Sequence, residues 1–93
     1  MEFEWDETKA ETNLRKHGVA FEDAVAVFED ERQFTEPAKT TGGEMRWKTT
    51  GRADRYAVLS IVHTARVVDG VEVIRLISAR PASRRERRLY DGQ

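Results

Sequence analysis

Two apolar segments lie on either side of the dipeptide Asp69-Gly70, and this arrangement limits the fold more than any other feature of the sequence. Tyr56–Thr64 and Val71–Ala79 carry Val, Ile and Leu at both odd and even positions, as strands do when both faces are buried. Asp-Gly is a strong signal for a two-residue hairpin turn. We therefore predict that these segments form a hairpin of two strands in the interior of a sheet.

The N-terminal third predicts one short strand and two helices. Alternation of Phe3 and Trp5 with acidic residues indicates the strand. The helices are expected over Glu7–Lys16, with Asp6 as N-cap and Gly18 as the stop, and over Phe21–Glu29. Helical spacing predicts that Ala10, Leu14 and His17 form the inner stripe of the first helix.

The remaining segments predict strands, turns and a closing helix. We expect a short strand around Arg32–Thr35, a loop over Glu36–Gly43, a strand over Glu44–Thr50, a turn at Gly51–Asp54 and a helix over Arg84–Tyr90. Pro81 ends the last strand, and Ser83 with Glu86 has the spacing of a capping box. The expected fold class is α+β: two N-terminal helices packed on an antiparallel sheet of hairpin-connected strands, with a short C-terminal helix, in one domain over 1–93.

Composition excludes several classes of protein. The 93 residues include no cysteine, which excludes disulfide scaffolds, thiolate metal sites and cysteine nucleophiles. The longest apolar run falls far short of the ~20 residues that span a bilayer. The acidic start of the chain does not resemble a signal peptide. We expect a cytoplasmic protein with no membrane partner.

The net charge of −1 conceals a strong division along the chain. Residues 1–31 carry ten acidic and three basic side chains, a balance of −7, whereas residues 32–93 carry thirteen basic and seven acidic ones, a balance of +6. Such asymmetry indicates an anionic partner for the basic part. Two solvated surfaces without a ligand would show the same pattern, and charge alone does not separate these interpretations.

Arginines of the basic part are candidates for phosphate binding, because the guanidinium fork matches phosphate oxygens. We expect Arg46, Arg66 and Arg80 to converge on one cleft, since neighbouring strands of a hairpin sheet lie close together. Further candidates lie on the strands and the last helix: Lys48, Arg75, Arg84, Arg87 and Arg88. Each of them individually has the alternative of an ordinary surface charge.

Two side chains are candidates for proton transfer. His63 lies near the end of an inner strand, on the same face as Leu59 and Ile61, and histidine titrates near neutral pH. It has the alternative of a core histidine satisfied by backbone. Glu44 is a possible base beside Arg46, or simply its surface ion-pair partner. The two histidines have no metal-ligand spacing, so we expect neither a metal nor a cofactor.

Several motifs together resemble toxins of the BrnT family over nearly the whole chain. They are Trp5–Lys9 leading into Asn13–Ala24, Val62–Thr64 followed by Arg66, Ile74–Arg80, and Ser83–Tyr90. The sequence departs from the family pattern at Ala65, at Pro81 and in a longer hairpin over Val67–Glu72. The longer hairpin bears on whether Arg66 and Arg80 can meet.

The resemblance implies a toxin of a type II toxin–antitoxin system with a fold similar to RelE-like ribonucleases. It implies metal-independent RNA cleavage that inhibits translation. It also implies a BrnA-type ribbon–helix–helix antitoxin, and contact with operator DNA only through the toxin–antitoxin complex. By motif, Arg66 and Arg80 are the first candidates for contacts to the scissile phosphate, followed by Arg46, with Glu44 or His63 as base or acid.

We also expect RNA contacts at the basic residues of the strands and the last helix, Lys48, Arg75, Arg84, Arg87 and Arg88, because of their positions. A non-catalytic binding module, acting as antitoxin co-repressor or as an RNA-binding partner, is the alternative function. A third hypothesis is an interaction protein whose basic surface meets an acidic partner segment, and that surface is the same as the candidate active site.

Overall fold

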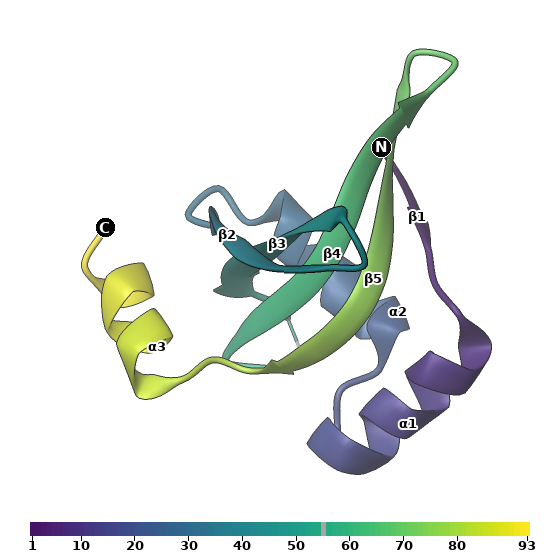
Figure 1. Cartoon of the computed structure of the whole chain (residues 1–93). Helices are drawn as coiled ribbons and strands as arrows, with labels where there is room; N and C mark the ends of the chain where they lie inside the picture. Colours follow the sequence, from purple (N-terminus) through teal and green to yellow (C-terminus); the bar gives the residue numbers. More distant parts are fainter. Residues whose placement is uncertain (55) are drawn as a thin grey trace.

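The computed structural model describes residues 1–54 and 56–93 and has the α+β arrangement predicted from the sequence (Figure 1). Its elements are β1 (Glu2–Glu4), α1 (Glu7–His17), α2 (Phe21–Ala24), the 3₁₀ helix η1 (Val25–Glu29), β2 (Phe34–Thr41), β3 (Glu44–Arg52), β4 (Val58–Val68), β5 (Val71–Pro81) and α3 (Arg84–Asp91). The strands form one five-stranded sheet in the order β1-β5-β4-β3-β2. The predicted hairpin of β4 and β5 is therefore at its centre.

The sheet is mixed rather than wholly antiparallel. Strands β2 to β5 are joined in sequence by hairpins and pair antiparallel, as predicted. Strand β1 pairs with β5 in the parallel direction. No turn connects these two strands, so the hairpin geometry that sets the direction of the other strands does not act on β1.

Both ends of α1 agree with the sequence, and Ala10 and His17 of the predicted stripe are partly buried, but Leu14 is not. Asp6 caps the helix by accepting from the Thr8 and Lys9 amides, and Gly18 closes it at φ 71°. Leu14, predicted to face inward, is 50% exposed, and Asn13 is buried instead. The Asn13 amide donates to the carbonyls of Val19 and Ala79 and accepts from the Ala79 amide, so a polar side chain joins α1 to β5. Its hydrogen bonds satisfy the amide in the interior.

The second predicted helix is divided. Only Phe21–Ala24 is α-helical, and Val25–Glu29 continues as a 3₁₀ helix. Phe21, Ala24 and Val27 are buried against the central strands, together with Leu59 and Ile61. Helical spacing predicts an apolar face of Phe21, Ala24, Val25 and Phe28; the tighter winding of η1 buries Val27 fully and leaves Val25 and Phe28 only partly buried.

The predicted loop over Glu36–Gly43 is wrong, because Glu36–Thr41 belongs to β2. Pro37 is accommodated since β2 is the edge strand of the sheet, where a missing amide hydrogen is tolerated. The turn contains only Gly42 and Gly43, both with positive φ.

The turn predicted at Gly51–Asp54 also begins late, because β3 runs to Arg52. A Cβ at Gly51 would lie 3.0 Å from side-chain atoms of both Gln33 and Val27. Glycine at this position therefore permits the close approach of η1 to the sheet.

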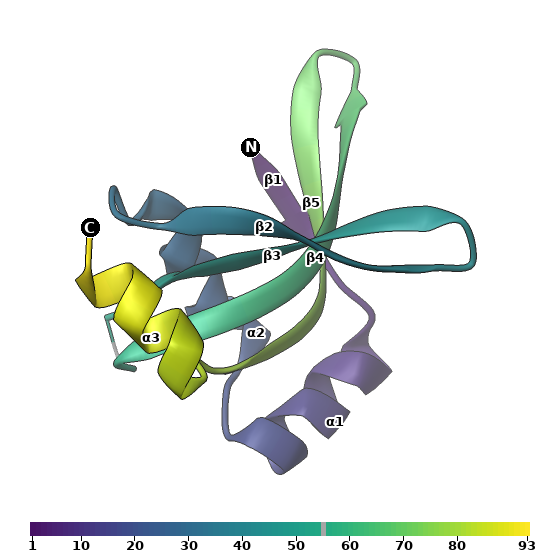
Figure 2. The same ribbon diagram turned by 60° about the vertical axis from the view of Figure 1, so that its left-hand side comes forward.

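The two faces of the sheet are covered unequally. Helices α1 and α2 and the helix η1 pack on one, the helix-covered face, and α3 lies over one end of the other, the open face (Figure 1). Figure 2 shows that the β2–β3 and β4–β5 hairpins diverge toward their tips. In the described part of the chain, therefore, no helix lies above most of the open face.

Candidate nucleic-acid interface

Strand alternation places the basic residues of the three inner strands on the open face. Lys48 is opposite Val62, and Ser60 is opposite both Thr50 and Arg80. Residues that pair across strands point to the same side of a sheet. A bulge at Val62/His63 shifts the register of β4 and β5 by one residue, so Arg75, opposite Thr64, also lies on this face.

A buried carboxylate on α3, that of Glu86, binds several of these residues of the open face. Glu86 is 1% exposed. Its oxygens accept from Arg80 Nη1 at 2.8 Å and Nη2 at 3.0 Å, from Ser60 Oγ at 2.8 Å and from the Ser83 amide at 2.8 Å, and they lie 2.6 Å from Lys48 Nζ. We call Lys48, Ser60, Arg80, Ser83 and Glu86 the Glu86 cluster.

Local sequence explains how Glu86 reaches the sheet. Ser83 caps α3 and Glu86 returns a hydrogen bond to the Ser83 amide, which completes the predicted capping box. This geometry turns the carboxylate back toward the start of the helix, where β5 ends at Pro81. Burial alone would raise the pKa of Glu86, but its hydrogen bonds from Arg80 and Lys48 hold that pKa far below the usual range.

A second carboxylate, Glu36 on β2, borders the Glu86 cluster. Its oxygens lie 2.8 Å from Arg85 Nη2 and 3.7 Å from Lys48 Nζ. The hydrogen bond from Arg85 lowers the pKa of Glu36, so this carboxylate is ionised at neutral pH. Among the described residues, its Oε2 is buried without a hydrogen-bond partner, which leaves an acceptor beside the cations.

A separate group lies toward the β4–β5 turn. Glu4 on β1 accepts from Arg66 Nη2 at 2.5 Å and from Arg75 Nη1 at 2.9 Å. We call these three residues the Glu4 cluster. It is more open than the Glu86 cluster, since the Arg66 side chain is 51% exposed. The two arginine hydrogen bonds lower the pKa of Glu4.

The expected convergence of Arg46, Arg66 and Arg80 on one cleft is wrong. Arg66 is opposite Val73, and Arg80 lies seven residues further along the same strand. At about 3.3 Å per residue this separates the two positions by about 23 Å. They share the open face, as alternation requires, but the long hairpin places them at its opposite ends.

Arg46 lies next along β3 from Lys48 on the same face, and it is half-buried. Its Nε is buried and has no hydrogen-bond partner within 1–54 and 56–93. A buried donor of this kind is suited to an incoming oxyanion. Glu44 is exposed at the start of β3, beyond the part of β3 that pairs with β4. It is therefore not part of the Glu86 cluster.

Helix α3 presents its other arginines outward. Arg84, Arg87 and Arg88 are exposed on its solvent side. Their positions fit the expectation of surface contacts to an anionic partner, in contrast to Arg80, which is held by Glu86. They extend the positive surface beside the Glu86 cluster.

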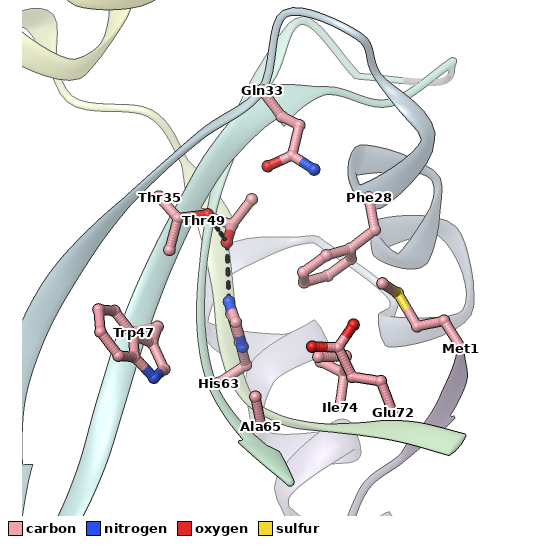
Figure 3. A pocket seen from close by; sticks show the side chains of 10 residues that line it. All are labelled: Met1, Phe28, Gln33, Thr35, Trp47, Thr49, His63, Ala65, Glu72 and Ile74. Carbon is pink, nitrogen blue, oxygen red and sulfur yellow. Dashed lines mark hydrogen bonds between the residues drawn. The ribbon is translucent and has the colours of Figure 1, made fainter. Parts of the chain in front are cut away.

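His63 lies on the helix-covered face and not with the arginines, so the structure separates it from the phosphate-binding candidates. It is 4% exposed, and its Nε2 lies 2.7 Å from Thr49 Oγ1. Its ring contacts Phe28 edge-on at 5.0 Å between centroids. Burial lowers the pKa of His63 and keeps the ring neutral at pH 7. Figure 3 shows it at the floor of a cavity of about 470 Å³.

Two further findings concern metal sites and membrane-spanning helices. Within residues 1–54 and 56–93, no group of three or more His, Cys, Asp or Glu side chains is placed to hold a metal ion. In the same part of the chain, no helix has the length and apolarity needed to cross a membrane.

Sequence reasoning missed the two acidic partners of the site. Glu36 falls in a segment predicted as a loop, and Glu86 is recognisable only as a helix cap. The capping box was nevertheless a usable signal, because a glutamate that must turn back toward Ser83 also faces the arginine three residues before that serine.

The chain belongs to a known class, the ribonuclease toxins of type II toxin–antitoxin systems. A family model described as "Ribonuclease toxin, BrnT, of type II toxin-antitoxin system" matches residues 5–86. The chain therefore belongs to the BrnT toxin family, as its motifs predicted. Membership of a type II system implies an antitoxin partner.

A solved structure agrees with this assignment. The chain resembles the ribonuclease toxin BrnT of Brucella abortus, with 27% sequence identity and a TM-score of 0.63, over 90% of this chain and 99% of that one. A search of curated proteins finds no match to this chain.

Proposed function

We propose that this toxin is a metal-independent, RelE-like endoribonuclease that cleaves RNA and thereby inhibits translation. A BrnA-type ribbon–helix–helix antitoxin neutralises it, and the two proteins together repress their operon, with operator DNA bound through the antitoxin. Family membership supports the ribonuclease class. The basic open face supports RNA as the substrate.

One observation carries the location of the site: Lys48 and Arg80 meet on a single carboxylate. Donors that converge on two carboxylate oxygens are also placed to bind two phosphate oxygens. We propose that the scissile phosphate takes the position of the Glu86 carboxylate, with Arg46 as a further donor from β3. Glu86 must withdraw from the cations when RNA binds.

The proposed reaction needs only groups of the RNA, of this chain and solvent water. The 2′-hydroxyl gives its proton to a base and its oxygen forms a bond to phosphorus. The bond to the 5′-oxygen breaks and that oxygen takes a proton from water, so a 2′,3′-cyclic phosphate and a 5′-hydroxyl remain. Lys48 and Arg80 stabilise the negative charge that grows on the phosphate oxygens. Their contribution rests on fixed position and charge more than on proton transfer.

Glu36 is the base that the geometry favours. It is ionised, borders Lys48 and has an oxygen without a hydrogen-bond partner in the described part of the chain. Glu44 is less suited because it is exposed beyond the β3–β4 pairing, and His63 because it lies on the other face. The low pKa of Glu36 makes it a weak base, consistent with a modest role for proton transfer.

The Glu4 cluster and the exposed arginines of α3 bind flanking RNA in this proposal. Arg66 lies about 23 Å along the face from Arg80, and Arg75, five residues before Arg80 on β5, lies about 17 Å from it. Both are within reach of a more distant part of one RNA strand. Exposed contacts of this type add affinity that weakens with salt.

Purified toxin incubated with RNA and excess EDTA tests the proposal. We expect cleavage to persist in EDTA and to yield cyclic phosphate ends. Lys48→Ala should reduce the rate at least tenfold, whereas Lys39→Ala on the exposed part of β2 should leave it unchanged. Loss of cleavage in EDTA contradicts the metal-independent mechanism.

The alternative of a non-catalytic binding module has one observation in its favour. Glu86 already binds Lys48 and Arg80, the two cations that a phosphate would need. If Glu86 never withdraws, the toxin contacts RNA only through exposed arginines. RNA that is bound but stays intact under all conditions would favour this alternative.

A further inference from the structure

A cavity on the helix-covered face has the chemistry of a base-binding pocket. It measures about 470 Å³, within the range of small-molecule sites. Its floor is formed by buried groups, with Thr49 1%, Ile74 2% and His63 4% exposed. The proposed phosphate site lies on the opposite face, so the cavity is a separate feature of the molecule.

Two aromatic rings form part of the cavity walls, and Met1, Ala65 and the carboxylate of Glu72 also line it. Trp47 lies on one side of His63 and Phe28 on the other (Figure 3). Phe28 is fixed by ring contacts to Phe3 at 5.3 Å and to His63 at 5.0 Å. Fixed aromatic walls favour a flat ligand with a π-face.

A chain of hydrogen bonds leads from the floor to the mouth. His63 Nδ1 lies 3.3 Å from the Thr64 carbonyl, Nε2 lies 2.7 Å from Thr49 Oγ1, and Thr49 Oγ1 lies 2.8 Å from Thr35 Oγ1. A carbonyl only accepts, so we assign the hydrogen to Nδ1, and Nε2 accepts the Thr49 hydroxyl. Thr49 then accepts from Thr35, and Thr35 Oγ1 is left as an acceptor at the mouth.

The neighbouring Gln33 amide supplies the complementary group. Its side chain points into the cavity beside Thr35 (Figure 3). An amide offers both donors and an acceptor. Together the two residues can accept from an amino group and donate to the ring nitrogen next to it. Adenine and cytosine carry this pair on their Watson–Crick edges, whereas uracil and hypoxanthine present a carbonyl and a ring N–H.

We propose that this cavity binds a nucleobase with an amino group beside a ring acceptor, adenine or cytosine, between Trp47 and Phe28. The base can come from a free nucleoside or from an RNA strand. Binding of a nucleoside needs neither the phosphate site nor cleavage, so this proposal stands or fails separately from the ribonuclease proposal.

Tryptophan fluorescence tests the proposal with uncharged ligands. The chain has two tryptophans, and Trp5 packs on Phe21 outside the cavity, so Trp5→Phe leaves Trp47 as the single reporter. We expect saturable quenching by adenosine and at least tenfold weaker binding of inosine, which has a carbonyl in place of the amino group. If Trp5→Phe does not fold, the Trp47 indole N–H resonance of the wild-type protein serves as the reporter.

Matched variants locate the ligand. Thr35→Val removes the acceptor at the mouth and should abolish the preference for adenosine over inosine. Thr40→Val, exposed on the same strand outside the cavity, should preserve it. A short oligoadenylate that also quenches Trp47 identifies RNA as a source, and quenching by adenosine alone identifies a free ligand. No saturable quenching by adenosine or cytidine at millimolar concentration, or an undiminished preference in Thr35→Val, overturns the proposal.

Discussion

The two clusters on the open face use the same chemistry in different surroundings. In each, one carboxylate is held by two cationic side chains. Glu86 is 1% exposed and also accepts from Ser60 and the Ser83 amide, whereas the side chain of Glu4 is 34% exposed and, among the described residues, accepts hydrogen bonds only from Arg66 and Arg75. The comparison teaches that burial, more than the number of charges, decides what a charged group contributes.

Neutralising the two carboxylates should affect stability unequally. Glu86→Gln leaves Arg80 and Lys48 without their counter-ion in a partly buried setting, and we expect it to lower the free energy of unfolding by about 2–3 kcal/mol, below the value for a fully buried pair because both cations retain some exposure. Glu4→Gln should have a much smaller effect. Urea denaturation of both variants measures the difference, and equal losses would contradict the role assigned to burial.

The Glu86 cluster should also make stability depend strongly on pH in the acid range. The pKa of Glu86 is strongly lowered in the folded protein, so its contribution is complete above the unfolded value of 4.5 and is lost as the pH falls below it. The free energy of unfolding should therefore drop steeply below pH 4.5, less so in Glu86→Gln. An identical acid profile in that variant would show that other carboxylates dominate.

Added salt should weaken the Glu4 cluster more than the Glu86 cluster. The exposed ion pairs of Glu4 are screened, so the stability difference between wild type and Glu4→Gln should shrink toward zero between 0.05 and 1 M NaCl. The corresponding difference for Glu86→Gln should persist, because a buried pair is screened much less. Urea titrations at both salt concentrations provide the comparison, and a loss of both differences would contradict it.

His63, on the helix-covered face, should cause a smaller change of stability with pH. Burial lowers the pKa of His63 below 6.5, so the unfolded chain binds a proton more readily than the folded one. Stability should be complete above pH 6.5 and decline slightly as the pH falls toward the folded pKa. Chemical denaturation of wild type and His63→Gln between pH 5 and pH 8 tests this, and a flat wild-type profile would contradict it.

Features set by local chemistry were predictable from the sequence. The Asp69-Gly70 hairpin, the Asp6 cap, the stop at Gly18 and the Ser83 capping box depend on residues a few positions apart, and all are present. Alternation along the strands likewise predicted that Leu59, Ile61 and His63 share a face. Family motifs predicted the class of protein.

Features set by tertiary contacts were not predictable. Asn13 is buried in place of Leu14 because its side chain hydrogen-bonds Ala79. Ala79 is 66 residues away in the sequence, so local spacing does not reveal this contact. Pro37 reads as a loop residue unless β2 is known to be an edge strand. The separation of Arg66 from Arg80 depends on the register of a long hairpin, and the carboxylate that holds Arg80 belongs to a helix outside the sheet.

The cleavage rate of one RNA by Arg80→Ala and Arg66→Ala tests the central claim, that the Glu86 cluster and not the Glu4 cluster is the phosphate site. Both variants lose one arginine from the same face, so charge loss is matched, and circular dichroism checks that each is folded. We predict at least a hundredfold loss for Arg80→Ala and less than tenfold for Arg66→Ala. A greater loss in Arg66→Ala, with Arg80→Ala close to wild type, would contradict the account.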